Sequence, residues 1–273
     1  MIHFRLLQAD RPYWWIHLPG VNIDYSYHIQ QFEKTCETGP GSPSGHLMVS
    51  SACYIILVSG ILKYSSTFSQ PARVAVKLTM FILLIEVILL ASLSRVFLLT
   101  HFPHQVLLGI VIGVTFSKRL LTRKFFANIS SRKYFLLALT VFFSSTFSYV
   151  LLGIFGRNPD WSIWLAERHC EKKEWVDLNT TPLNGIIRIS ACLLGLSITS
   201  QYLRTRVVSM ELSLMTMPVV LAFSYYLTSY DFSSVDIYTF YMYNFIRYLL
   251  FSVFILQIFP VFINRTFKLF IKQ

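Results

Sequence analysis

Two arginines and two histidines stand in or beside strongly apolar stretches of the sequence, where charged side chains are costly. They are Arg11, His46, Arg95 and His101. Guanidinium groups match the oxygens of a phosphate, and two histidines supply a nucleophile and a proton donor near neutral pH. The sequence around them has no carboxylate cluster suitable for Mg²⁺. The set therefore predicts a phosphoryl-transfer site that uses neither a metal nor another cofactor.

The segment CETGPGSPSGH, residues 36–46, ends directly before an apolar run. The start of a helix exposes unpaired backbone N–H groups and the positive end of the helix dipole, which favour an anion. Gly45 permits close approach to the backbone, and Ser44 adds a hydroxyl donor. By itself, the segment is equally consistent with a helix cap followed by an interfacial histidine.

The second segment, residues 92–105, carries Arg95 inside an apolar run, where an ionisable residue commonly marks function. On a continuous helix His101 would lie about 240° around the axis from Arg95 and would not share its face. Pro103 disfavours helical geometry at the preceding residue. We therefore expect the chain to turn here and to bring Arg95 and His101 into one pocket.

Composition predicts the class of protein that holds these residues. Of the 273 residues, 54% are hydrophobic and only 14% are charged, against about 25% charged in soluble domains. Continuous apolar runs without alternation indicate helices rather than an outer-membrane barrel. We predict an all-α, polytopic transmembrane bundle forming one membrane-embedded domain over residues 1–273. Seven spans are expected, at 45–62, 78–100, 104–117, 134–155, 184–203, 212–230 and 239–263.

Charge distribution predicts the orientation of these spans. Fourteen of the 24 Lys and Arg residues fall in loops on one side, which is therefore expected to be cytosolic together with the C-terminus. Eleven of the 13 acids fall on the opposite side, with the segment that ends at His46. The net charge of +11 then reflects cytosolic loops and not nucleic-acid binding. The fourteen basic residues are Lys63, Arg73, Lys77, Lys118, Arg119, Arg123, Lys124, Arg132, Lys133, Arg204, Arg206, Arg265, Lys268 and Lys272.

The four cysteines show no metal-binding spacing. Cys36 and Cys170 fall on the non-cytosolic side, where a disulfide can form, although their pairing is left open by the sequence. Cys53 and Cys192 lie in predicted spans and are expected to be packing residues.

Three short motifs resemble the signature of the type 2 phosphatidate phosphatase and vanadium haloperoxidase superfamily: RP at 11–12, PSGH at 43–46 and SRxxxxxH at 94–101. Within it, RPYWW, CETGPGSPSGH and SRVFLLTHFPHQV resemble the glucose-6-phosphatase catalytic subunit family. The segment WSIWLAERHCEKKEWVDLNTTPLNGIIR is similar to a luminal segment of that family. The likeness covers essentially the whole chain.

The resemblance implies a role for each site residue. His101 would be the nucleophile that forms a phosphohistidine, and His46 would protonate the leaving sugar oxygen. Arg11, Arg95, Ser44 and Gly45 would bind the phosphate. His104 and Gln105 are expected to support the nucleophile, with Gln105 in place of the carboxylate that the wider superfamily has four residues after it.

The resemblance also implies an endoplasmic-reticulum membrane protein whose luminal site hydrolyses glucose 6-phosphate. The lipid bilayer and a glucose-6-phosphate transporter are the expected partners. The family's signature lysine falls on Phe4, with Arg5 one residue out of register, and two of its nine spans would precede Met1. The chain is therefore expected to lack an N-terminal portion. Two alternatives remain open: a catalytically silent isoform of the same fold, and a lipid or polyprenyl phosphate phosphatase, which Gln105 disfavours.

Overall fold

A computed structural model describes residues 9–21, 29–122, 129–205, 210–229 and 236–258. Within these ranges the chain is helical and has no strand, apart from one isolated bridge between Glu37 and Asp177. This confirms the predicted all-α class. The chain forms two compact units, one of residues 1–124 and 156–182 and the other of residues 125–155 and 183–273.

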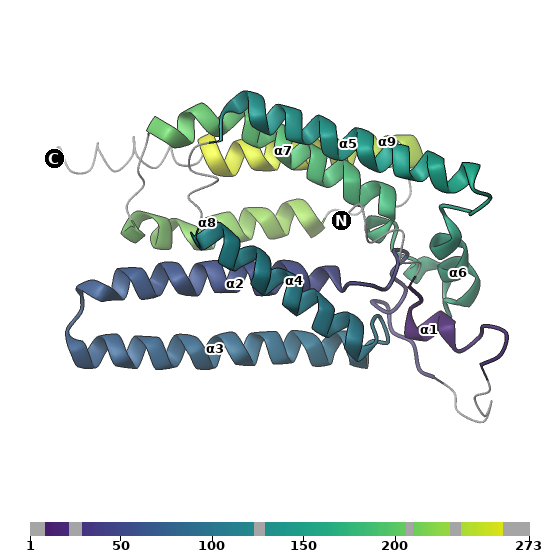
Figure 1. The fold of residues 1–273 in the computed structure, drawn as a ribbon, viewed down its shortest axis with the longest axis horizontal. Helices are drawn as coiled ribbons and strands as arrows, with labels where there is room; N and C mark the ends of the chain where they lie inside the picture. The colour runs from purple at the N-terminus through teal and green to yellow at the C-terminus, as the bar shows by residue number, and fades with distance from the viewer. Residues whose placement is uncertain (1–8, 22–28, 123–128, 206–209, 230–235, 259–273) are drawn as a thin grey trace. The chain divides into compact units, whose positions relative to one another are not determined.

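The first unit contains the segments that carry the predicted site. Its helices α2, α3 and α4 lie side by side, with α1 and α6 at one end of them (Figure 1). Their bounds are α1 Pro12–Trp15, α2 Gly45–Tyr64, α3 Gln70–Phe97, α4 Pro103–Thr122 and α6 Trp161–His169, with short 3₁₀ turns at Ser65–Thr67, Lys173–Trp175 and Leu178–Thr180.

The described residues of the second unit form four long helices. Ser131 on α5 donates a hydrogen bond of 2.6 Å to the Ser197 carbonyl on α7. Arg188 on α7 and Arg247 on α9 both lie over the ring of Tyr248, at 5.0 and 5.7 Å from its centroid. The helices are α5 Ser131–Ile154, α7 Pro182–Thr205, α8 Met210–Ser229 and α9 Ile237–Val253, the last continuing as a π-helix over Phe254–Ile258.

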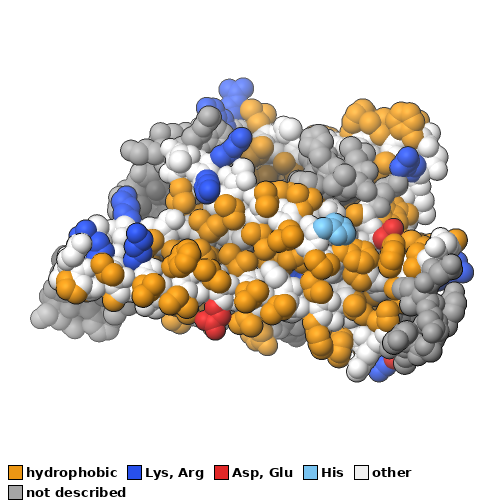
Figure 2. Space-filling model, turned by 60° about the horizontal axis from the view of Figure 1, so that its bottom comes forward, with side chains coloured by type: hydrophobic (Ala, Val, Ile, Leu, Met, Phe, Trp, Pro, Cys, Tyr) orange, Lys and Arg blue, Asp and Glu red, His pale blue; other side chains and the backbone are white. Residues whose placement is uncertain are grey.

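Six of the described helices are long and apolar enough to cross a membrane. They correspond to six of the seven predicted spans, and the predicted span at 212–230 corresponds to α8, whose described apolar part is the shorter Met217–Leu227. No residue of α3 is buried, and many of its Leu, Ile and Phe side chains are more than half exposed. Figure 2 shows hydrophobic side chains spread over much of one face. Such exposure is expected where lipid replaces water.

Two predicted spans differ most from the helices in their bounds. The third was expected at 104–117, which is short for a bilayer; α4 instead begins at Pro103 and continues to Thr122. The second was expected at 78–100, but α3 begins at Gln70 and ends at Phe97. Proline fits the first turn of a helix because its missing N–H has no intrahelical acceptor there. Pro71 and Pro103 therefore mark the starts of these helices.

Glycines let α4 approach α2 closely. Gly109 and Gly113 lie one turn apart on α4, and both are buried. A Cβ added at Gly109 would lie 2.6 Å from the Ser44 carbonyl, and one at Gly113 would overlap the Ser51 hydroxyl. Small residues at this spacing allow helix backbones to pack in membranes. The contact brings the start of α2, with His46, against the start of α4.

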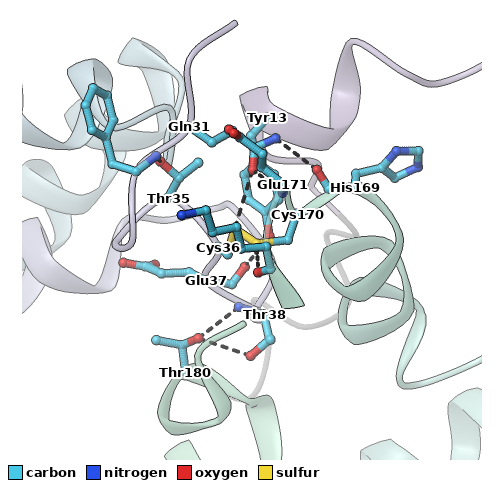
Figure 3. Close-up of a disulfide and its surroundings, with 12 residues drawn as sticks. Tyr13, Gln31, Thr35, Cys36, Glu37, Thr38, His169, Cys170, Glu171 and Thr180 are labelled. Atoms are coloured by element: carbon cyan, nitrogen blue, oxygen red, sulfur yellow. Dashed lines mark hydrogen bonds between the residues drawn. A yellow bond between two sulfur atoms is a disulfide. The ribbon is translucent and has the colours of Figure 1, made fainter. Parts of the chain in front are cut away.

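A disulfide joins Cys36 to Cys170 and closes the end of the first unit (Figure 3). It answers the pairing question that the sequence left open. Tyr13 and Trp14 of α1 pack with Cys36 against Leu165 and Ala166 of α6 in one buried cluster. The cluster holds the RPYWW segment over the ends of the spanning helices, where the predicted site residues lie.

Candidate active site

The side chains of the two arginines and two histidines predicted for the site converge on the carboxylate of Glu37. Its Oε2 lies 2.7 Å from Nη1 of Arg11, and its Oε1 lies 3.3 Å from Nη1 of Arg95. Oε1 also lies 3.6 Å from Nδ1 of His46, and Oε2 lies 3.9 Å from Nε2 of His101. Residues distant in sequence therefore meet in one small volume at the ends of α2, α3 and α4.

Arg11 is fixed from several directions. Its Nε donates to the Gly39 carbonyl at 2.6 Å, and its Nη1 donates to the Thr100 carbonyl at 3.0 Å as well as to Glu37. The residue is only 4% exposed. Arg11 thus joins three segments of the site, whereas its sequence context alone favours an interfacial anchor.

The chain turns between Arg95 and His101, as Pro103 predicted. Helix α3 ends at Phe97, and Leu99 has a φ of 56° in the left-handed region, which is uncommon for a residue other than glycine. The backbone N–H of His101 then donates a hydrogen bond to the Arg95 carbonyl at 3.4 Å. This turn brings two side chains together that would point apart on a straight helix.

His101 is held as a neutral imidazole with a free lone pair. Its Nδ1 lies 2.7 Å from the Gly41 carbonyl and therefore carries the proton, which leaves Nε2 as the unprotonated nitrogen. Burial, assisted by the positive charge of Arg11, lowers the pKa of His101 to about 3. Nε2 is buried and has no hydrogen-bond partner. A buried, unprotonated imidazole nitrogen that makes no hydrogen bond has its lone pair available as a nucleophile.

The start of α2 adds a second unpartnered polar atom. The Ser44 hydroxyl is buried and makes no hydrogen bond, so it does not cap the helix that it precedes. A Cβ added at Gly45 would meet nothing within 4 Å, which leaves open space beside the first turn. His46 follows with a side chain that is 56% exposed. The site is therefore closed behind His101 and open beside His46.

Gln105 and His104, the two predicted supporting residues, lie in different surroundings. Gln105 is buried; its Oε1 accepts from the Phe102 N–H at 3.1 Å, and its Nε2 donates to the Asp10 carbonyl at 2.8 Å. It fixes the turn that carries His101. His104 is exposed and stacks on Phe102, so it does not join the cluster around Glu37. Phe4 and Arg5, which bear on the signature lysine, lie outside the described residues.

Glu37 is the site residue that sequence reasoning missed. It is the only acid within CETGPGSPSGH, and by sequence it is one of the eleven acids on the side opposite the basic loops. Burial would raise the pKa of its carboxyl group, but Arg11 and the other cationic groups outweigh burial and hold that pKa below its ordinary value. Glu37 is therefore an ionised carboxylate in the middle of the site.

The carboxylate and the two imidazoles also offer a metal-ligand geometry. One ligand atom from each of Glu37, His46 and His101 lies within 4.8 Å of the others. However, two arginines approach the same carboxylate, and a divalent cation placed there would be repelled by both. The local charge favours an anion instead.

Residues 5–129, which carry the three motifs on a helical membrane scaffold, match the PAP2 superfamily. Glucose-6-phosphatase 3 of Rattus norvegicus is 39% identical over 194 residues, which cover 70% of this chain and 55% of that protein. Glucose-6-phosphatase catalytic subunit 1 of Haplochromis nubilus is 32% identical over 250 residues, covering 88% and 70% respectively. That of Haplochromis xenognathus is 32% identical over 247 residues, covering 87% and 88%.

The chain belongs to the glucose-6-phosphatase catalytic subunit family. The resemblance carried by the three motifs is thereby confirmed. The chain is a multi-pass membrane protein. It spans about half the length of several of the curated relatives that it matches, such as 55% of the rat protein. No solved structure is significantly similar to it.

Proposed function

We propose that this chain is a membrane phosphohydrolase that cleaves glucose 6-phosphate into glucose and inorganic phosphate through a phosphohistidine on His101. The observation that carries the proposal is the buried Nε2 of His101, which makes no hydrogen bond and lies 3.9 Å from the carboxylate that pairs with Arg11 and Arg95. The names of the relatives support glucose 6-phosphate as the substrate.

The first chemical step is transfer of the phosphoryl group to His101. Nε2 attacks phosphorus, the bond from phosphorus to the sugar oxygen breaks, and His46 gives that oxygen a proton. The new phosphohistidine keeps its proton on Nδ1, where the Gly41 carbonyl stabilises the positive ring at 2.7 Å. Arg11 and Arg95 stabilise the charge on the phosphoryl oxygens.

The second step releases phosphate. His46 removes a proton from water, the resulting hydroxide attacks phosphorus, and the bond between phosphorus and Nε2 breaks. The exposed side of His46 suits both steps, because the sugar leaves and water enters from the open side of the site.

The substrate class is tested by phosphate release from the purified chain in detergent. Glucose 6-phosphate is expected to be hydrolysed faster than phosphatidate, because Gln105 replaces the carboxylate of the wider superfamily. Preference for phosphatidate would favour the lipid phosphatase. Absence of turnover on every phosphate monoester would favour a catalytically silent isoform.

The site is further proposed to face the lumen of the endoplasmic reticulum, with the C-terminus in the cytosol and a glucose-6-phosphate transporter as partner. The excess of Lys and Arg in the opposite loops supports this orientation, and the disulfide at the site end suits an oxidising compartment. Protease added to intact microsomes is expected to remove a C-terminal tag and to spare the loop at 156–183. If the protease cleaves that loop and the tag survives, the orientation is the opposite of the one proposed.

A further inference from the structure

A single buried carboxylate links the two arginines of the site. Each oxygen of Glu37 pairs with a different arginine, Oε2 with Arg11 at 2.7 Å and Oε1 with Arg95 at 3.3 Å. The Glu37 side chain is 9% exposed and that of Arg95 is 18% exposed. The pairs therefore lie where solvent screens charges weakly, unlike an ion pair on the surface.

The backbone of Glu37 is held from both sides. Its neighbour Cys36 is bonded to Cys170, and the Tyr13 hydroxyl donates to the Glu37 carbonyl at 2.9 Å. The Asp177 N–H donates to the Cys36 carbonyl at 3.0 Å. These contacts, several of which are visible in Figure 3, give the carboxylate a fixed base from which to reach the arginines.

We propose that Glu37 is a positioning residue that brings the guanidinium groups of Arg11 and Arg95 together and orients them for a phosphate. The inference rests on the proposed function for the identity of the bound group. Two guanidinium groups confined to one small volume repel each other, and a carboxylate between them removes that repulsion. Two arginines and one carboxylate leave a net positive charge, so the site still attracts an anion.

Orientation adds to the effect of charge. A free arginine side chain populates many rotamers, and binding must fix one of them. Arg11 has further fixed acceptors in the Gly39 and Thr100 carbonyls. Among the described residues, Arg95 has beside Glu37 only a long side-chain hydrogen bond, of 3.5 Å, to the Ser94 hydroxyl. Loss of Glu37 is therefore expected to free Arg95 more than Arg11.

The test compares the unmodified chain with Glu37→Gln, which keeps the side-chain volume and removes the charge. Calorimetry in detergent measures binding of inorganic phosphate, and Glu37→Gln is expected to weaken it by about tenfold or more, the scale of one lost charged contact. The matched control is Glu33→Gln, which removes an exposed acid paired with Lys34 from the same loop. The control is expected to bind phosphate as the unmodified chain does.

A second measurement reports on the arginine itself. Phenylglyoxal modifies accessible guanidinium groups, and mass spectrometry gives the rate for each arginine. Arg95 is expected to react about tenfold faster or more in Glu37→Gln, whereas the exposed Arg73 is expected to react at an unchanged rate. If Glu37 only supported folding, its replacement would not raise the modification rate of Arg95 while leaving that of Arg73 unchanged.

Glu37→Asp covers the case in which Glu37→Gln leaves a buried arginine uncompensated and does not fold. It keeps the charge but withdraws the carboxylate by one methylene, so weaker phosphate binding and faster labelling of Arg95 are again expected. Phosphate binding as tight as in the unmodified chain, or tighter, in either variant would overturn the inference and identify Glu37 as a bystander or an internal competitor.

These outcomes separate the inference from the proposed function. If the unmodified chain does not bind phosphate, there is no phosphate site and both proposals are wrong. Binding without hydrolysis would remove only the proposed activity, because the role of Glu37 would still be decided by the binding and labelling data.

Discussion

Replacement of His101 by alanine is expected to abolish covalent labelling by phosphate-labelled substrate and to lower turnover by about 10³-fold or more, as loss of a nucleophile does elsewhere. The reason is geometric, because the unprotonated Nε2 of His101 is buried, makes no hydrogen bond and lies 3.9 Å from the carboxylate that pairs with both arginines. The covalent label is measured by reacting the chain with phosphate-labelled substrate and recovering the phosphopeptide in alkali, where a phosphohistidine is stable.

His104→Ala is the matched control for this prediction. His104 stands three residues further on, is exposed and stacks on Phe102 outside the cluster. Labelling and turnover should survive its loss. Label recovered on His104, or unchanged labelling in His101→Ala, would contradict the assignment of the nucleophile.

The lowered pKa of His101 leads to a prediction of how labelling depends on pH. An ordinary imidazole gains its proton near pH 6.5, but burial and Arg11 hold the pKa of His101 at about 3. Since protonation occurs only near that lower pH, the nucleophile remains available through the acidic range. Labelling by an aryl phosphate should therefore show no loss near pH 6.5 that depends on His101.

Much of the scaffold could be predicted from the sequence, because hydropathy in a bilayer is a local property. Apolar runs of spanning length formed helices at the expected places, with shifts of a few residues at most ends. The larger shift at the start of α3 arose because Gln70–Lys77 contains charged residues and yet continues the helix beyond the apolar run. Hydropathy marks the apolar run, whereas hydrogen bonding decides where the helix begins.

The convergence of Arg95 and His101 could also be predicted, since Pro103 signals a break in the helix. The particular turn could not, because the positive φ of Leu99 has no sequence signal such as glycine. His104 illustrates the opposite case. Its proximity in sequence suggested a supporting role, but the turn directs His101 inward and leaves His104 on the exposed first turn of α4.

Glu37 could not be assigned from sequence because its burial is a tertiary effect. A lone acid in a polar loop is normally solvated, and nothing local indicates that α1, α6 and a disulfide of sequence separation 134 cover it. The glycines of α4 were missed for a similar reason: Gly109 and Gly113 appear as ordinary residues of an apolar run until α2 is seen against them. The burial of Glu37 and the close packing at these glycines both depend on contacts between segments distant in sequence.

His46→Ala is expected to lower hydrolysis of glucose 6-phosphate by about 10²–10⁴-fold, the range for loss of a general acid or base. A sugar alcohol is a poor leaving group unless it is protonated, and the exposed imidazole of His46 stands on the open side from which the sugar departs. An aryl phosphate needs little protonation because its phenolate leaves readily. With that substrate, His46→Ala should still transfer the phosphoryl group to His101.

The label formed in His46→Ala should then persist, because no base remains to activate water for the second step. Rapid quenching at increasing times measures both its formation and its decay. In the unmodified chain the label should turn over within the assay, whereas in His46→Ala it should accumulate toward one per chain. If the label forms on His46 in the unmodified chain, the two histidines have exchanged roles. If His46→Ala reduces labelling by the aryl phosphate as much as labelling by glucose 6-phosphate, His46 acts in binding and not as the acid.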